Sequence, residues 1–188
     1  MGSSSRERRE AAEDALLALR CQRGDREAFA HLVARWEARL FYYIRRLAPT
    51  EEDAWDALQE TWIRVVASIH TLRDESLLAP WLYRLARNVA VSQFRLGRHE
   101  RELREPADEL ADIENAEPEF TADDAEQVHC ALDQVALPFR EVLTLFFIQG
   151  LSVAQIATIV EIPEGTVKSR LHYARRALRE AMEKGGRP

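Results

Sequence analysis

The chain has 188 residues, of which 46% are hydrophobic and 31% are charged, and its formal net charge is −6. This length fits one ordinary domain or two small ones. No apolar run approaches the roughly 18 residues that indicate a membrane span, so we expect no membrane insertion by the chain itself. Cys21 and Cys130 show no metal-type spacing, which predicts a reducing, cytoplasmic setting.

The charge is unevenly distributed along the chain. Residues 105–126 contain ten Asp or Glu and no Lys or Arg, and without these ten negative charges the remainder would carry +4. Positive charge gathers in residues 81–104, with six Arg against two Glu, and in residues 163–188, with seven Lys or Arg against three Glu. We therefore expect two basic regions separated by an acidic segment.

Apolar residues in the first half recur at the spacing of one helix face. A helix of about 20 residues is predicted here, with Asp25 as its N-cap and Pro49 closing it. Its apolar face comprises Phe29, Leu32, Val33, Trp36, Leu40, Ile44 and Leu47. Helices are also predicted over 11–23, 51–70 and 80–96. The inner stripe of the 51–70 helix comprises Ala54, Leu58, Thr61, Trp62, Val65, Val66 and Ile69.

These patterns predict an all-α fold made of two small helical domains joined by an acidic linker. The first domain covers residues 10–100, after a disordered start over 1–9. The linker covers 101–124, whose acids and scarce apolar residues cannot offset the entropy of ordering. The second domain covers 125–184, with helices over 125–136, 138–149, 152–160 and 164–183, and residues 185–188 form a tail.

Residues 151–182, "LSVAQIATIVEIPEGTVKSRLHYARRALREAM", have the layout of a helix-turn-helix. Ser152 is the expected N-cap, and Val153, Ile156, Ala157 and Val160 are expected to face inward. The second helix is expected to bury Val167, Leu171, Ala174 and Leu178. Its expected exposed side comprises Lys168, Ser169, Arg170, His172, Tyr173, Arg175, Arg176 and Arg179. Such a helix suits the DNA major groove, and the alternative is a solvated basic face on an ordinary hairpin.

Two further segments carry a family resemblance. "DAWDALQETWIRVV" (53–66) followed by "PWLYRLARNVAVSQFR" (80–95) resembles region 2 of bacterial sigma factors, in particular the small extracytoplasmic-function (ECF) group of the sigma-70 family. "GLSVAQIATIVEIPEGTVKSRLHYARRAL" (150–178) resembles region 4 of the same family. The two matched domains cover about 150 of the 188 residues, in the expected order.

The resemblance implies a promoter-specificity subunit of RNA polymerase, with core polymerase (its β′ clamp and β flap), promoter DNA and an anti-sigma protein as partners. It implies core-polymerase contacts at Asp53, Asp56, Gln59, Glu60 and Trp62. It implies contacts with the promoter −10 element at Thr71, Arg73, Trp81, Arg84, Arg87, Asn88 and Arg95. It implies contacts with the −35 element at Thr166, Lys168, Ser169, Arg170, His172, Tyr173, Arg175 and Arg176.

Some positions depart from the family pattern or keep a second interpretation. Trp55 and Ser92 stand where the family commonly has acidic residues. Trp81 is open to core packing as well as DNA contact, and the acidic stripe on the 51–70 helix is open to a solvated face. In the family the acidic linker runs toward the polymerase active-site cleft and RNA exit path; the alternative is a solubilising tether.

We expect no enzymatic activity and no cofactor, since no phosphate-binding glycine loop, zinc set or nucleophile–base arrangement is visible in the sequence. The alternative from another class is a stand-alone helix-turn-helix regulator, whose first domain dimerises or senses a ligand. A third, weaker hypothesis is a hydrolase that uses Asp53, Asp56 and Glu60.

Overall fold

The computed structural model describes residues 3–94 and 125–185, which are helical and contain no strand. The all-α prediction is confirmed for this part of the chain. Contacts divide the chain between residues 95 and 96 into two compact units, each described by itself below. The predicted linker, 101–124, and the predicted tail, apart from Gly185, lie outside the described residues.

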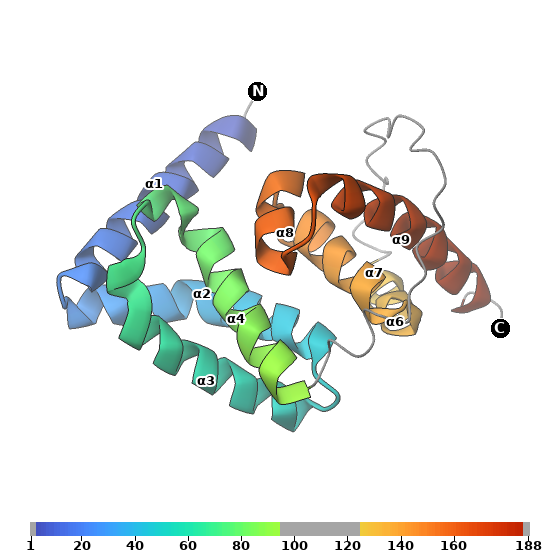
Figure 1. Cartoon of the computed structure of the whole chain (residues 1–188), viewed down its shortest axis with the longest axis horizontal. Helices are drawn as coiled ribbons and strands as arrows, with labels where there is room; N and C mark the ends of the chain where they lie inside the picture. Colours follow the sequence, from blue (N-terminus) through green and yellow to red (C-terminus); the bar gives the residue numbers. More distant parts are fainter. Residues whose placement is uncertain (1–2, 95–124, 186–188) are drawn as a thin grey trace. The chain divides into compact units, whose positions relative to one another are not determined.

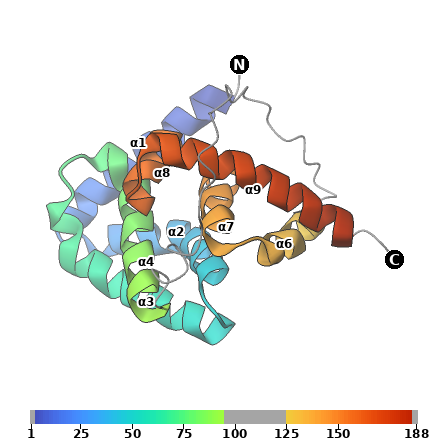
Figure 2. The ribbon, with the colours of Figure 1, turned by 45° about the vertical axis from the view of Figure 1, so that its right-hand side comes forward.

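The first unit packs four α-helices, α1 (Ser3–Gln22), α2 (Arg26–Leu47), α3 (Glu51–Ser68) and α4 (Leu78–Phe94). Two short 3₁₀ helices, η1 (Ile69–Thr71) and η2 (Glu75–Leu77), connect α3 to α4. Helix α2 contacts the other three α-helices, and α4 crosses it in both views (Figures 1 and 2). The buried face of α2 comprises Ala28, Leu32, Trp36, Leu40, Tyr43, Ile44 and Leu47.

Three aromatic rings form the centre of this core. Tyr83 of α4 meets Trp36 edge-on, with ring centroids 5.9 Å apart, and meets Tyr43 edge-on at 5.3 Å. All three side chains are almost fully buried. Edge-to-face packing of this kind adds stability beyond the burial of apolar area. Burial also raises the pKa of Tyr83 above its usual value, so its hydroxyl stays protonated.

Both ends of α2 form as the sequence predicts. The side chain of Asp25 accepts hydrogen bonds from the backbone N–H groups of Glu27 and Ala28, and the helix ends at Leu47, before Pro49. Bonds from the Ala28 backbone and from Arg20 lower the pKa of Asp25. The stabilisation that the Asp25 carboxylate gives the folded chain is therefore fully present above its pKa in the unfolded chain. It is lost as the pH falls through the lowered pKa of the folded chain.

Helix α1 begins earlier than expected. The sequence predicts a disordered start over 1–9 and a helix from 11, but the helix already begins at Ser3. Residues 6–13 are Arg, Glu and Ala, which all favour helix. Apolar spacing does not predict the first part of this helix because residues 3–10 contain no apolar residue.

The second unit contains α6 (Ala125–Gln134), α7 (Leu137–Leu143), a π-helical turn η4 (Thr144–Ile148), α8 (Val153–Val160) and α9 (Glu164–Gly185). Helix α9 contacts α6, α7 and α8, with α8 near its start and α6 toward its end (Figure 2). The predicted single helix over 138–149 is instead divided at Thr144. Gln149 N–H reaches the Thr144 carbonyl at 3.0 Å, five residues back, which is the π-helical spacing.

Candidate functional site

The acidic end of α3 is partly occupied by its own cap. Thr50 and Asp53 form a capping box, in which the Asp53 carboxylate accepts from the Thr50 hydroxyl at 2.7 Å and the Thr50 backbone N–H at 3.2 Å. Asp53 thus satisfies donors at the helix N-terminus. Of the three acidic residues predicted to contact polymerase, this one has a local structural role.

Asp56, Gln59 and Glu60 lie on the outer side of α3. Asp56 and Gln59 are exposed, and half-buried Glu60 accepts from Arg64 Nε at 2.8 Å, one turn further along. Exposed Ile63 extends this side of the helix, with 58% of its surface accessible. A partner would meet two acidic side chains and an amide beside an apolar side chain.

Two tryptophans of α3 have different environments. Trp62 is half-buried and packs edge-on against Phe29 of α2 at 6.1 Å, and its indole N–H is buried with no acceptor among the described residues. Trp55 is 48% exposed and stacks on Phe41 of α2 at 4.0 Å. Trp55, which stands where the family commonly has an acidic residue, therefore places an aromatic surface next to Asp56.

Val66 contradicts its predicted place on the inner stripe of α3. It is 59% exposed, whereas Thr61 and Val65 are fully buried. The buried stripe advances from Thr61 to Val65 to Ile69, which leaves Val66 on the outer side of the helix with Ile63. The α3 surface is more apolar than the sequence analysis expected.

The residues predicted to contact the −10 element separate into exposed and buried groups. On α4, Arg84 and Asn88 are exposed four residues apart, and Trp81 is half-buried. Arg87 is only 7% exposed, so its side chain is buried in this unit although the resemblance implies a DNA contact there. It follows Tyr83 by four residues and precedes Ala90 by three, so it belongs to the buried stripe. Arg95 lies outside the described residues.

The α3–α4 connection carries the other two predicted contacts with the −10 element. Thr71 and Arg73 are exposed, on either side of buried Leu72. The Thr71 hydroxyl donates to the Ser68 carbonyl at 2.7 Å. Asp74 caps η2 by accepting from the Ser76 backbone N–H at 3.0 Å. The connection is thus a structured turn with polar side chains at its surface.

In the second unit, α8, its turn and α9 form the predicted helix-turn-helix. Ser152 caps α8 as predicted, and Gln155 completes a capping box by accepting from the Ser152 backbone N–H at 2.9 Å. Glu161 ends α8 with a left-handed backbone, φ 60°. The core-facing residues of α8 are Ile156, Ile159 and Val160, whereas Val153 and Ala157 are only half-buried.

Helix α9 presents a basic stripe, with one correction. Lys168, His172 and Arg176 are exposed at intervals of four residues, and Arg176 pairs with Glu180 at 3.1 Å. Arg170 is expected on the exposed side but is 7% exposed. Its position three residues after buried Val167 and four before buried Ala174 places it on the inward face.

The remaining residues predicted for the −35 element are half-buried: Thr166, Ser169, Tyr173 and Arg175. Among them, the Ser169 hydroxyl donates to the Thr166 carbonyl at 3.0 Å, and Tyr173 meets His172 edge-on at 5.4 Å. The Arg175 guanidinium lies 5.2 Å from the ring centroid of Phe147, within the same unit. These side chains lie between the exposed Lys168–His172–Arg176 stripe and the buried face of α9.

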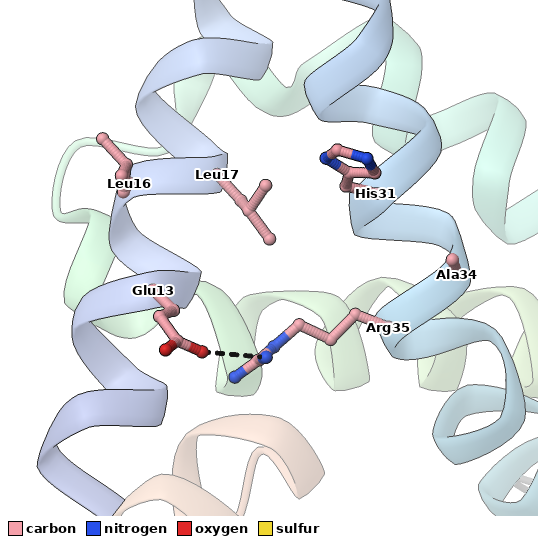
Figure 3. Close-up of a pocket in the computed structure, with 6 residues that line it drawn as sticks. All are labelled: Glu13, Leu16, Leu17, His31, Ala34 and Arg35. Carbon is pink, nitrogen blue, oxygen red and sulfur yellow. Dashed lines mark hydrogen bonds and ion pairs between the residues drawn. The ribbon is translucent and has the colours of Figure 1, made fainter.

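A groove of about 480 Å³ lies between α1 and α2. Glu13 and Arg35 are joined across it at 3.2 Å, and Leu17 points from α1 toward α2 (Figure 3). Asp53, Asp56 and Glu60 of the hydrolase hypothesis do not line this groove but lie on the surface of α3. Within residues 3–94 and 125–185 we find no cluster of three His, Cys, Asp or Glu placed to hold a metal ion. The same residues contain no helix long and apolar enough to cross a membrane.

Comparison with known proteins decides between the remaining hypotheses. Residues 32–100 match sigma-70 region 2, and residues 125–178 match sigma-70 region 4. The RNA polymerase sigma-H factor of Pseudomonas aeruginosa is 34% identical over 182 residues, which cover 91% of this chain and 94% of that protein. The chain belongs to the sigma-70 family.

Further relatives place it in the ECF group of that family. The ECF RNA polymerase sigma-E factor of Escherichia coli K12 is 32% identical over 176 residues, covering 88% of this chain and 92% of the relative. The solved structure of the sigma factor RpoE of Bartonella quintana, in complex with the anti-sigma factor NepR, has a TM-score of 0.63 at 26% identity, covering 82% and 96%. CnrH, solved with the cytosolic domain of CnrY, shares the fold, with a TM-score of 0.67 at 23% identity. The chain is an ECF RNA polymerase sigma factor, and the stand-alone regulator is not favoured.

Proposed function

We propose that this sigma factor binds core RNA polymerase through the outer side of α3 and brings it to promoters read by α4 and α9. The observation that carries this proposal is the combination of two family matches on one chain, with exposed polar side chains on the helices concerned. A promoter-specificity subunit acts by binding and positioning, so it needs no catalytic group of its own. We place it in the cytoplasm, with the polymerase.

The polymerase surface is proposed to comprise Asp56, Gln59 and Glu60 with the adjoining apolar side chain of Ile63. Exposed acids suit a basic partner surface and accelerate encounter with it. Asp53 and Trp62 support this surface from within, since the first caps α3 and the second packs it against Phe29. We further propose β′ clamp contact by the first unit and β flap contact by the second.

The promoter surfaces follow from the exposure of basic and polar side chains. For the −10 element we propose Arg84 and Asn88 of α4 with Thr71 and Arg73 of the preceding loop. For the −35 element we propose the exposed stripe Lys168, His172 and Arg176, whose charge suits the phosphates that flank a major groove. Half-buried Thr166, Ser169, Tyr173 and Arg175 position this stripe, and buried Arg87 and Arg170 stabilise their helices.

An anti-sigma protein is proposed as a regulator. The support is the related RpoE, which was crystallised with its anti-sigma factor. The sites proposed for polymerase and DNA are exposed in the absence of a partner, and a protein that covers one of them would prevent initiation.

Reconstituted transcription tests the proposal. Purified chain is mixed with core polymerase and a library of bacterial promoter fragments, and transcript starts are mapped. We expect initiation from a defined subset that shares −10 and −35 sequences, with none from core polymerase alone. Starts that are the same with and without the chain would contradict the proposed function.

A further inference from the structure

Gln22, the last residue of α1, links this helix to the loop that follows α3. Its side-chain Nε2 donates to the carbonyl of Leu72 at 2.7 Å and to the carbonyl of Ile69 at 3.2 Å. A primary amide has two N–H donors, and here both are used on the same loop. The bonds are partly buried, so water competes with them less than at an open surface.

The two carbonyls lie at either end of the turn that presents His70 and Thr71. Ile69 and Leu72 are 6% and 7% exposed, so their side chains anchor the turn in the core. The residues between them are exposed. Leu72 N–H also donates to Ile69 O at 3.2 Å. Gln22 therefore fixes the two ends of a short turn whose middle faces solvent.

Helix α1 can act as a fixed support because it is tied to α2. The buried carboxylate of Asp14 accepts from Arg35 Nε at 2.6 Å and from Trp36 Nε1 at 3.2 Å. Two residues before Gln22, Arg20 pairs with the α2 N-cap Asp25 at 2.8 Å. The match to sigma-70 region 2 begins at residue 32, so it includes the 69–72 turn but not Gln22.

We propose that Gln22 is a positioning residue for −10 recognition, because its amide holds the 69–72 turn in the shape that presents Thr71 to the −10 element. This inference depends on the proposed function of the loop. A turn that is already ordered loses less conformational entropy when it binds DNA than a mobile one does.

Three substitutions separate a donor role from simple packing. Gln22→Glu replaces the donor with an acceptor of the same shape, which faces two carbonyl oxygens. Gln22→Met keeps an unbranched chain of similar length without donors. Gln22→Lys restores donors on a flexible chain. Arg23→Ala, at the exposed neighbour, is the control.

The first readout is discrimination, measured as initiation from the preferred −10 sequence divided by initiation from promoters with one −10 base changed. We expect this ratio to fall about twofold to tenfold in Gln22→Met, as for the loss of one or two hydrogen bonds, and further in Gln22→Glu. Gln22→Lys and Arg23→Ala should retain most of it. Core-polymerase affinity should be unchanged in all four variants.

The second readout is amide hydrogen exchange in the sigma factor alone. Exchange at residues 70–73 should accelerate in Gln22→Glu and Gln22→Met while the α2 and α4 cores keep their protection. Unchanged discrimination and unchanged exchange in Gln22→Glu would overturn the inference. Equal losses in Met, Glu and Lys would also overturn it, since they indicate packing. If the unaltered chain directed no promoter-specific initiation, the proposed function would fail, whereas exchange would still report on the Gln22 bonds.

Discussion

Lys168 and Arg170 differ by two positions on α9 and face opposite ways. Lys168 is exposed, and Arg170 is 7% exposed beside Leu171, which is also buried. On a helix a step of two residues turns the side chain by more than half a circle. The Lys168 side chain therefore lies on the surface of the unit, whereas the Arg170 side chain is packed inside it.

Lys168→Ala should weaken initiation from −35-containing promoters. A base contact in the major groove is worth about 1–3 kcal/mol, or roughly fivefold to 150-fold. The thermal midpoint of unfolding should stay the same because the side chain is exposed. Run-off transcription and circular dichroism measure the two effects, and a promoter with a scrambled −35 sequence serves as control. A loss of equal size on both promoters would contradict the assignment.

The burial of Arg170 and Arg87 could have been deduced from the sequence. Arg170 lies three residues after Val167, and Arg87 lies four after Tyr83, so both fit the apolar stripes of their helices. A positively charged side chain suggested a DNA contact at Arg87 and Arg170, whereas the spacing of these residues from apolar neighbours indicated burial. For these two arginines spacing was the better guide, because a long side chain can bury its stem when its head group has partners.

At the level of single helices, α3 has one face that packs in the core and one side that is open to a partner. Its buried face comprises Ala54, Ala57, Leu58, Thr61 and Val65. Its outer side carries Asp56 and Gln59, with exposed apolar surface at Trp55 and Ile63. A change confined to the outer side should alter association with a partner and leave the core intact.

Asp56→Arg should reduce association with core polymerase at least about tenfold at low salt, because it places a like charge against a basic partner surface. The loss should shrink as ionic strength rises. Helicity and the thermal midpoint should be unchanged. Glu183→Arg, the same charge reversal at an exposed residue of α9, is the control. Co-sedimentation or biolayer interferometry gives the affinity, and wild-type affinity for Asp56→Arg would remove this face of α3 from the interface.

Helix caps were predictable, whereas the π-helical turn was not. Asp25 and Ser152 each precede an apolar helical pattern, and their short side chains can accept from free N–H groups at the helix start. The change from α to π geometry at Thr144 alters the hydrogen-bond partner by one residue. Apolar periodicity over so short a segment does not distinguish the two geometries. The Gln22 bonds to Ile69 and Leu72 were equally hidden, because they join residues 47 and 50 positions apart.

At the scale of the whole molecule, two helical units carry separate family matches on one chain. The −6 net charge conceals this arrangement, because ten acidic residues in 105–126 outweigh the basic stretches on either side. Sequence patterns were sufficient to predict both helical units and their order. The polar bonds that join distant segments, such as those from Gln22 to Ile69 and Leu72, could be found only from the packing of the unit.

We propose that this sigma factor recognises promoters only when it is bound to core polymerase. Fluorescence anisotropy of a labelled promoter duplex, titrated with the chain alone and with the chain plus core polymerase, tests it directly. We predict weak, sequence-independent binding by the chain alone, and tight binding that requires intact −10 and −35 sequences once core polymerase is present. Tight, sequence-specific binding by the chain alone that core polymerase does not change would contradict promoter recognition through polymerase.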